Sequence, residues 1–486
     1  MFLHNIRSMK ILIKNGVVVT STDHYKADIL VQDGKIDRIE NRLPENLAQK
    51  VIDAEGKFVF PGGIDPHVHL YLPTPAGYTS DDFLSGGICA LYGGTTSIID
   101  FVTPQKGQPL PEALKIRIDE AKNCPIGYSF HVSPVDWREN SEKEIQECIE
   151  LGFPSFKIYL AYKDTIGLSD DNAYHVMKVV GKHNGMVTAH CELGDEINAS
   201  RDLFFSQKMV SPLYHMLSRT AEIESSSVKR AIDIADQTNC PLYIVHVSAG
   251  DSLKHIYLAQ QSGQPIYAET CPQYLLLDES KYYGEFDETV KYVISPPLRK
   301  IENLNQLWEG IKQHTIQTIG TDHCPFSLSQ KSVGKNDFRK IPNGAGGIEH
   351  RLEFLYTFGV LQNRISLNQM VDLYSTQPAK IFGLYPQKGE LAVGSDADIV
   401  IWNPNSEKKI SAKNHHSKAD ISIYEGFKVK GSSQFVFLKG KIVIENGKMI
   451  TDLPKGELLK RNIHKINPDY GRSGDEDRQS NNCGRV

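Results

Sequence analysis

Two histidines, His67 and His69, stand two residues apart at the end of the apolar run 58–70. The run is typical of a buried strand, in which side chains two positions apart project to the same side. Two imidazoles that project together from a strand end can bind one metal ion, whereas a helical pair would need a spacing of about three or four. The pair predicts part of a metal site, and further ligands must come from elsewhere in the chain.

Other ionisable residues also close apolar runs. They are Lys157 in the run 156–162, His190 at the end of 186–190, His246 in 242–247 and Asp322 directly after 316–321. Each residue alone has an ordinary alternative, as a hydrogen-bonded buried histidine, a lysine that reaches solvent or an aspartate that caps a helix. The joint pattern favours a site for zinc or a similar divalent ion, because imidazole and carboxylate groups suit such metals.

The elements that must position these residues form a regular series. Eight apolar runs alternate with longer amphipathic segments, at residues 58–70, 95–102, 126–135, 156–162, 186–190, 242–247, 266–270 and 316–321. Alternating strands and helices predict parallel strands with crossover connections. Eight such units predict an α/β fold with a TIM-like (β/α)8 barrel, whose active site lies at the carboxyl ends of the strands.

Both ends of the chain have a different texture. Short β-type runs are separated there by pairs such as Asp33-Gly34 and Asn446-Gly447, which are hairpin signals. We therefore predict a small β-sandwich domain built from both chain ends. The predicted divisions are 1–60 and 389–460 for the two parts of the sandwich, 61–388 for the metal-dependent barrel, and 461–486 for a polar, disordered tail.

The composition limits the function classes. The 486 residues are 40% hydrophobic and 23% charged, which is ordinary for a soluble protein. The net charge of -5 provides no basic footprint for nucleic acid and no polybasic membrane patch. The sequence has no apolar stretch near the roughly 18 residues of a spanning helix, and no signal peptide is expected. Eight cysteines without CxxC spacing fit a reducing compartment, so we expect a cytoplasmic protein.

A set of short segments points to a specific family. In chain order they are Pro61–His69, Gly93–Thr96, Ser155–Lys157 with Ala161–Asp164, Glu269–Leu275, Ser295–Arg299, Asp322–Phe326 and Lys340–Gly344. With these segments the chain resembles the hydantoinase/dihydropyrimidinase family of cyclic amidohydrolases, within the amidohydrolase superfamily. The resemblance runs from residue 9 to residue 460.

The resemblance implies two divalent metal ions, with zinc as the default. His67, His69 and Asp322 would hold one ion, His190 and His246 would hold the other, and Lys157 would bridge them as a carbamate, N6-carboxylysine. A neutral lysine cannot span two cations, but a carbamate presents two anionic oxygens. A nearby cation lowers the lysine pKa and so favours the uncharged amine that carbamylation requires.

The resemblance also implies the reaction, which is hydrolysis of the cyclic amide of dihydropyrimidines or hydantoins. Asp322 would take the proton of a metal-activated water and pass it to the leaving nitrogen. Tyr162 would contact the substrate and stabilise the oxyanion. Its offset of five from Lys157 means that it reaches the site only from the loop beyond the strand. Ser295 and Asn343 would bind the imide edge, chiefly through backbone groups, although both also suit plain turns.

Two rival activities and a non-catalytic alternative stay open. Dihydroorotases usually have an arginine two residues past the second histidine, where this chain has Tyr71, which counts against that activity. Allantoinases have nearly the same metal ligands, and the loop 70–79 differs from common hydantoinase loops, so the preferred ring is open. Scaffold relatives have lost metal ligands, whereas this chain retains all six.

Several neighbouring residues are not predicted as ligands. Cys191, His323 and Cys324 lie next to predicted ligands, but adjacent strand residues face opposite sides. His131 ends the third run and suits packing better than a contact behind a ligand. Family members are commonly tetramers, so a homotetramer that acts on a small cyclic amide or ureide is expected.

Overall fold

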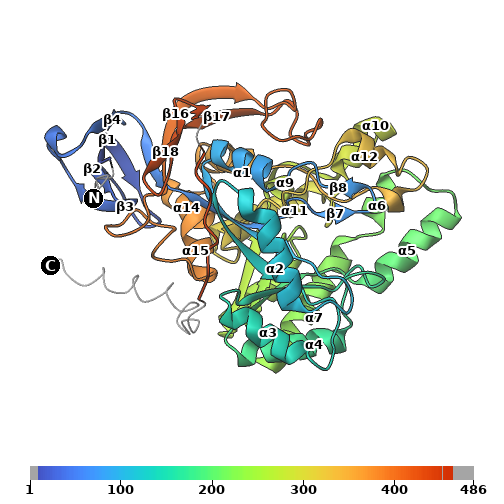
Figure 1. Cartoon of the computed structure of the whole chain (residues 1–486). Coiled ribbons are helices and arrows are strands. Elements are labelled where there is room, and N and C mark those ends of the chain that lie inside the picture. Colours follow the sequence, from blue (N-terminus) through green and yellow to red (C-terminus); the bar gives the residue numbers. More distant parts are fainter. Residues whose placement is uncertain (1–8, 451–452, 463–486) are drawn as a thin grey trace, which may run out of the picture.

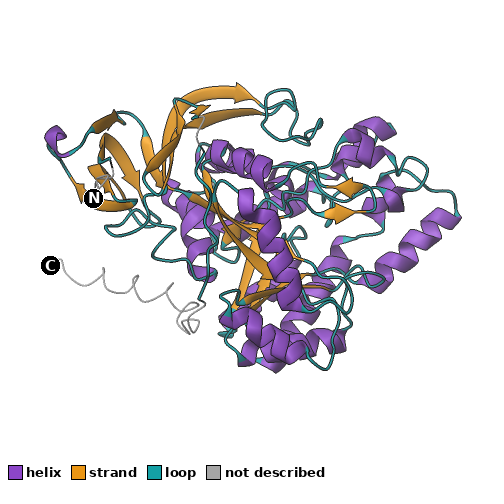
Figure 2. Ribbon diagram, viewed as in Figure 1, coloured by secondary structure: helices purple, strands orange, loops and turns teal. Residues whose placement is uncertain are grey.

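The structure, a computed structural model, describes residues 9–450 and 453–462. Its centre is a cylinder of parallel strands that helices surround (Figure 1, Figure 2). In spatial order the eight strands are β6 (Gly63–Val68), β9 (Thr95–Val102), β10 (Gly127–Val132), β11 (Ser155–Tyr159), β12 (Met186–His190), β13 (Leu242–Ile244), β14 (Ile266–Thr270) and β15 (Thr318–Ile319). Neighbours in space are neighbours in the sequence of barrel strands, and all pairs are parallel. The predicted (β/α)8 barrel is confirmed.

The cylinder closes where its last strand meets its first. The strand order begins with β15 and ends with β6, so these two strands are the edges that must meet. A parallel bridge between Val68 and His323 joins them. Closure therefore takes place at the carboxyl end of the strands, beyond the two residues of β15.

Helices occupy the crossovers. They are α1 (Phe83–Tyr92), α2 (Leu110–Glu120), α3 (Ser141–Glu150), α4 (Asp170–Lys182), α5 (Gly194–Ser206), α6 (Leu213–Leu217), α7 (Ala221–Thr238), α8 (Ser252–Gln261), α9 (Pro272–Leu276), α10 (Phe286–Thr289), α11 (Ile301–Lys312), α12 (Leu328–Ser332), α13 (Arg351–Phe354), α14 (Leu367–Val371) and α15 (Gln377–Ile381). The Ser169 side chain accepts a hydrogen bond from Asn172 N at the start of α4, and Thr220 accepts one from Ile223 N at the start of α7. Such caps satisfy amides that have no partner within the helix.

A second sheet is assembled from both chain ends, as predicted. Its nine strands are β1 (Ile11–Val19), β2 (His24–Gln32), β3 (Lys35–Glu40), β4 (Lys50–Asp53), β5 (Phe58–Pro61), β16 (Ile399–Lys409), β17 (Lys428–Leu438), β18 (Lys441–Glu445) and β19 (Lys448–Met449). The two ends join where β5 and β16 pair antiparallel, with Val400 opposite Phe60. Buried side chains such as Ile13, Ile29 and Ile399 give this sheet an apolar core of its own.

One predicted barrel strand needs correction. The run 58–70 forms two strands in different sheets, because β5 belongs to the nine-stranded sheet and β6 to the barrel. The break falls at Gly62, where an added Cβ would lie 2.2 Å from Thr96 Oγ1. A hydrophobic run shows that a segment is buried but not which sheet it joins.

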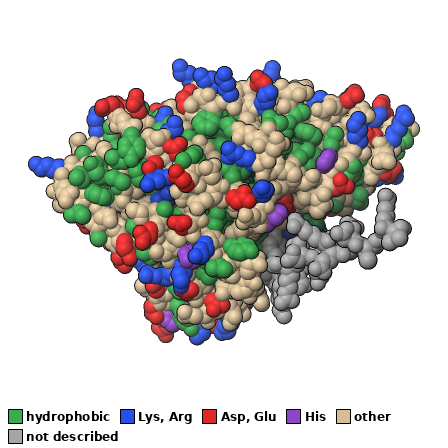
Figure 3. Space-filling view, turned by 180° about the vertical axis from the view of Figure 1, so that it is seen from behind, with side chains coloured by type: hydrophobic (Ala, Val, Ile, Leu, Met, Phe, Trp, Pro, Cys, Tyr) green, Lys and Arg blue, Asp and Glu red, His purple; other side chains and the backbone are tan. Residues whose placement is uncertain are grey.

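The far end of the described chain is anchored to the barrel. Arg461 is 3% exposed and donates to Ser129 Oγ at 2.8 Å. The ordered chain thus passes the predicted start of the tail, and the rest of that tail from residue 463 lies outside the described residues. No helix in the described ranges is long and apolar enough to cross a lipid bilayer. Figure 3 shows acidic and basic side chains interspersed over one face.

Candidate metal centre

The six predicted metal ligands all lie toward the carboxyl end of the barrel. His67 is in β6 and His69 directly follows it, Lys157 is in β11, His190 ends β12, His246 follows β13 and Asp322 follows β15. Parallel strands place these positions around one mouth of the cylinder. Lys157 is 0% exposed and His67 is 1% exposed, so the group is shielded from bulk solvent.

The first group of side chains gathers at Asp322. His67 Nε2 lies 3.3 Å and His69 Nε2 lies 3.1 Å from Asp322 Oδ1. One ligand atom each from His67, His246 and Asp322 lie within 4.8 Å of one another. Residues more than 250 positions apart are thus brought within the diameter of one coordination sphere.

His190 and Lys157 complete the cluster. His190 Nδ1 lies 2.9 Å from His246 Nε2, and the two ring centroids are 4.6 Å apart. Burial, and after it the charge of Lys157, hold the pKa of His67 well below its ordinary value. Burial and then His190 and Lys157 do the same to the pKa of His246. All six predicted residues therefore share one site.

These residues fit a bound cation. The depressed pKa values keep His67 and His246 neutral, which is the form that binds metal. His67 Nε2 is buried and makes no hydrogen bond within the described part of the chain, so its lone pair is free for a ligand bond. Buried polar atoms normally have a partner, and several imidazoles that face one carboxylate suit a positive ion between them.

A buried glutamate orients the His67 ring. The sequence alone had suggested no role for it. Glu269 Oε1 lies 2.6 Å from His67 Nδ1 and also accepts from His246 N at 3.1 Å. Tyr243 Oη donates to the second carboxylate oxygen at 2.8 Å. Burial raises the pKa of Glu269 to about 7. With the proton on Nδ1 directed at Glu269, His67 presents Nε2 to the cluster.

A second buried glutamate does the same for His190. Glu192 Oε2 lies 2.7 Å from His190 Nε2, which leaves Nδ1 directed at His246. Burial alone would raise the pKa of Glu192, but Arg219 holds it at about 2. The sequence signal that could have revealed both glutamates is a carboxylate in or just beyond an apolar strand, since such a group needs a buried partner.

The amine of Lys157 lies in surroundings that favour its neutral form. Burial lowers the pKa of Lys157 to about 8, although Asp322 and Glu269 oppose the shift. The amine lies 4.8 Å from the centroid of the Phe101 ring, which provides no hydrogen bond acceptor of ordinary strength. With a pKa of about 8, roughly one-tenth of the amine is uncharged at pH 7, far more than for an ordinary lysine, and the uncharged amine is the form that reacts with carbon dioxide.

Tyr162 reaches the centre from the loop after β11, as its offset from Lys157 predicts. Its ring centroid is 5.3 Å from that of His190. The carbonyl of Tyr162 accepts from Thr165 N and Gly167 N, each at 2.9 Å, which folds the loop tightly. A Cβ added at Gly167 would lie 2.0 Å from Ala161 O, so only glycine fits there without a shift.

The predicted substrate residues lie on two joined segments. Ser295 Oγ is buried and has no hydrogen bond partner in residues 9–450 and 453–462, which leaves it free for a ligand. Gly344 N, next to Asn343, donates to Val293 O at 3.1 Å. Gly344 has a φ of 150°, and a Cβ there would lie 2.3 Å from Cys324 O. The segments around Ser295 and Asn343 are therefore held side by side.

Three of the predicted site residues have left-handed backbone. The φ angles are 40° for His246, 51° for Asp322 and 56° for Tyr162. Residues other than glycine adopt this region at a cost of about 1–3 kcal/mol, and they concentrate where function requires a fixed side-chain direction. The backbone strain at this mouth of the barrel is thus consistent with a constrained active site.

Comparison with known proteins agrees with this geometry. The profile of the amidohydrolase family matches residues 58–443. The chain belongs to the amidohydrolase family. It is 42% identical over 453 residues to a D-hydantoinase of Geobacillus stearothermophilus, which covers 93% of this chain and 96% of that protein. It is 38% identical over 457 residues to a D-phenylhydantoinase of Escherichia coli O1:K1, with 93% and 98% covered. The crystal structure of dihydropyrimidinase from Brevibacillus agri NCHU1002 matches with a TM-score of 0.92 at 39% identity, over 94% of this chain and 100% of that one.

In this amidohydrolase barrel, His323 holds the mouth together. Its carbonyl accepts from His69 N at 2.9 Å, and its backbone bridges both Val68 and Ala345. Its ring is directed elsewhere, because Nδ1 accepts from Gly347 N at 3.0 Å and Nε2 lies 3.1 Å from Asp81 Oδ2. His323 therefore connects the segments that carry the predicted ligands and the predicted substrate residues.

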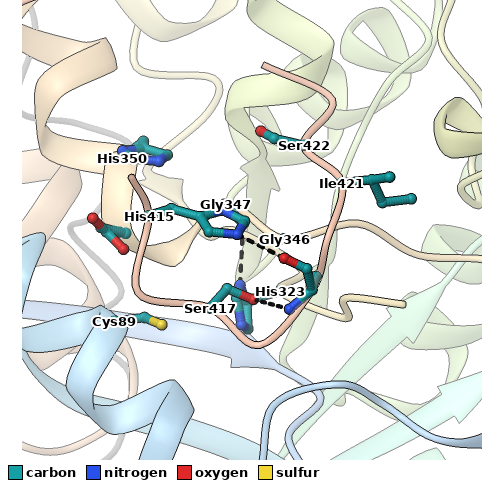
Figure 4. A pocket seen from close by; sticks show the side chains of 11 residues that line it. Cys89, His323, Gly346, Gly347, His350, His415, Ser417, Ile421 and Ser422 are labelled. Carbon is teal, nitrogen blue, oxygen red and sulfur yellow. Dashed lines mark hydrogen bonds between the residues drawn. The ribbon is translucent and has the colours of Figure 1, made fainter. Parts of the chain in front are cut away.

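A cavity is lined in part by His323. His415 and Ser417, on a loop between β16 and β17, line it together with His323 and His350 (Figure 4). Asp81 accepts from Ser417 Oγ at 2.5 Å and from Lys418 N at 2.9 Å. The loop from the second sheet therefore contacts the same aspartate that holds the His323 ring.

The remaining neighbours serve packing or support. Cys191 and Cys324 are buried free thiols outside the group of three ligand atoms that lie together. His131 Nδ1 lies 2.7 Å from Ser155 Oγ, and its Nε2 lies 3.0 Å from Pro66 O, so both ring nitrogens are engaged. This places His131 as a hydrogen-bonded core residue.

Proposed function

We propose that this amidohydrolase opens the rings of dihydropyrimidines and hydantoins by hydrolysing their cyclic amide bond. The product type is that of 5,6-dihydrouracil converted to N-carbamoyl-β-alanine. The observation that carries the proposal is the convergence of His67, His246 and Asp322 within 4.8 Å at the barrel mouth. The names of the relatives, D-hydantoinase and dihydropyrimidinase, support the same substrate class.

The proposed cofactor is a pair of divalent ions, and zinc suits the nitrogen and oxygen donors. His67, His69 and Asp322 would hold one ion, His190 and His246 would hold the other, and Lys157 would lie between them as N6-carboxylysine. The depressed pKa of Lys157, about 8, supports the modification because carbamylation needs the uncharged amine. When bound, the ions lower the pKa of water toward 7 and polarise the scissile carbonyl.

Asp322 is the proposed proton carrier. Burial alone would raise its pKa, but His67 and His69 hold it below the ordinary value, so the carboxylate starts ionised. It can therefore accept the proton of the attacking water. As the ring C–N bond breaks, the same proton passes to the departing nitrogen, which leaves Asp322 ionised again.

Tyr162 and two backbone segments are proposed to hold the substrate. The phenol of Tyr162 would donate a hydrogen bond to the carbonyl oxygen as negative charge develops there. The backbone around Ser295 and Asn343 would pair with the flat imide edge of the ring. The unpartnered, buried Ser295 Oγ is compatible with this role.

The decisive experiment compares turnover of dihydrouracil, hydantoin and allantoin by one preparation of known metal content. We expect ring opening of the first two to be faster than that of allantoin. Faster opening of allantoin would make the chain an allantoinase instead. A preparation that binds no divalent ion and turns over none of the three would favour the non-catalytic scaffold.

Assembly and location are also proposed by resemblance. We expect a homotetramer, which light scattering of the full chain would test. The buried cysteines of the described chain are free thiols, which supports a reducing compartment such as the cytoplasm. Cell fractionation would check that location.

A further inference from the structure

Arg219 is a buried cation that contacts two parts of the candidate site. It lies between α6 and α7 and is 2% exposed. Its Nη1 donates to Glu192 Oε2 at 2.5 Å, and its guanidinium carbon lies 5.3 Å from the centroid of the Tyr162 ring. The guanidinium therefore contacts both a buried carboxylate and the ring of the predicted oxyanion donor.

The contacts of Arg219 form a continuous chain. Glu192 Oε2, which accepts from Arg219, also lies 2.7 Å from His190 Nε2. The ring of His190 is in turn 5.3 Å from the ring of Tyr162. One guanidinium thus supports both the side chain predicted to bind metal and the side chain predicted to bind the oxyanion.

The arginine is itself fixed from behind. The carbonyl of Arg219 accepts from Arg299 Nη1, whose guanidinium is paired with Glu224 at 2.9 Å. A buried arginine with a fixed backbone and a single short ion pair has little freedom to move. Its Nε has no hydrogen bond partner among the described residues, and the Tyr162 ring is a further contact of the same guanidinium.

We propose that Arg219 is a positioning residue for ring opening, which orients the Tyr162 phenol directly and the His190 imidazole through Glu192. This inference rests on the proposed function. A cation beside the phenol strengthens the phenol O–H as a donor while charge develops on the substrate carbonyl. The effect of Arg219 should therefore appear in kcat and should require the Tyr162 hydroxyl.

A double-mutant cycle between Arg219→Lys and Tyr162→Phe tests this role. Lysine keeps a charge for Glu192 but loses the planar group beside the phenol. We expect Arg219→Lys to lower kcat roughly 10–100-fold, with KM and bound zinc changed less than about threefold. In the Tyr162→Phe background the same change should lower kcat by less than about threefold, because the hydroxyl it supports is gone.

The matched control is Arg351→Lys. Arg351 is 0% exposed and its guanidinium carbon lies 4.6 Å from the Tyr374 ring, so it is an equally buried arginine against a tyrosine. Its hydrogen bonds go to Ile64 O, Ile319 O and Thr95 Oγ1, none of which belongs to a predicted ligand. This variant should lower the thermal midpoint without changing kcat per bound zinc.

The outcomes separate the two levels of proposal. The positioning role is overturned if the effects of Arg219→Lys and Tyr162→Phe on kcat multiply in the double variant. It is also overturned if Arg219→Lys loses stability but keeps its kcat. A wild-type protein that binds zinc but opens none of the rings would instead overturn the proposed function. Should Arg219→Lys not fold, Glu192→Gln removes the carboxylate that holds Arg219, and the same cycle then applies with bound zinc as the second readout.

Discussion

The carboxylate of Glu269 offers the sharpest test of the metal centre. Glu269→Gln conserves shape but replaces one acceptor oxygen with an amide group that can only donate. Glu269 Oε1 lies 2.6 Å from His67 Nδ1 and accepts from His246 N at 3.1 Å, while Tyr243 Oη donates to Oε2 at 2.8 Å. With the amide nitrogen at the Oε1 position, His67 Nδ1 and His246 N would face a donor. With the nitrogen at the Oε2 position, the Tyr243 hydroxyl must turn to accept, and the oxygen that faces His67 Nδ1 no longer carries a charge.

The magnitude follows from these contacts. Losing one charge-assisted hydrogen bond in a buried site costs about 1.5–3 kcal/mol. Without this hydrogen bond the His67 ring can rotate away from the direction in which it would bind metal. Zinc affinity should therefore fall roughly 10–100-fold. Glu353→Gln is a suitable control, because Glu353 is 2% exposed and lies 3.0 Å from Nδ1 of His350, a histidine that is not among the predicted ligands.

The assay is a competition between the metal-free protein and a chromophoric chelator for zinc. We expect weakened zinc binding in Glu269→Gln and unchanged zinc binding in Glu353→Gln, with both variants less stable in urea. Wild-type zinc affinity in Glu269→Gln would refute the reasoning that this glutamate sets the direction of the His67 ring.

Three further outcomes are expected. Lys157→Ala should lose activity and part of its bound metal, and short carboxylic acids should restore some of the rate; full activity without added acid would contradict the bridging role. Gly167→Ala, whose methyl would meet a backbone carbonyl at 2.0 Å, should lower kcat by displacing Tyr162, whereas Gly346→Ala, with nothing nearer than 3.5 Å, should not. Burial would raise the pKa of Asp81, but its contact with His323 lowers this pKa from 3.8 to about 2. The ionised carboxylate therefore contributes roughly 2 kcal/mol to the free energy of unfolding above pH 4, and this contribution is lost as the pH falls toward 2. Over that pH range, the free energy of unfolding measured by urea titration should fall less steeply for Asp81→Asn than for the wild-type protein.

The barrel could be predicted because each of its strands is recognisable from a short stretch of the sequence. Each barrel strand is a short apolar run, and the alternation with amphipathic segments determines the parallel order. The residues predicted as ligands were identifiable for the same reason, since each lies in or just beyond such a run. The prediction of one strand for the run 58–70 was wrong, because strands of both sheets are buried and apolar. Gly62 alone marks where the chain passes from the nine-stranded sheet to the barrel.

The side chains that hydrogen-bond the site histidines and hold them in place could not be predicted in the same way. Glu269 contacts His67 across 202 positions, and Asp81 contacts the His323 ring across 242. Hydrophobic periodicity carries no information about which distant polar group a buried imidazole meets. Arg219 was hidden for another reason, because it lies between two helices, where an arginine is ordinarily exposed.

The place where the barrel closes has a consequence for its dynamics. The two edge strands meet through His323, and His67 and His69 lie on one side of that junction with Asp322 on the other. An ion shared by the three side chains would cross-link the junction, so opening of the wall and release of the ion become the same event. Amide hydrogen exchange at His69, which donates to His323 O across this junction, should then report metal occupancy directly.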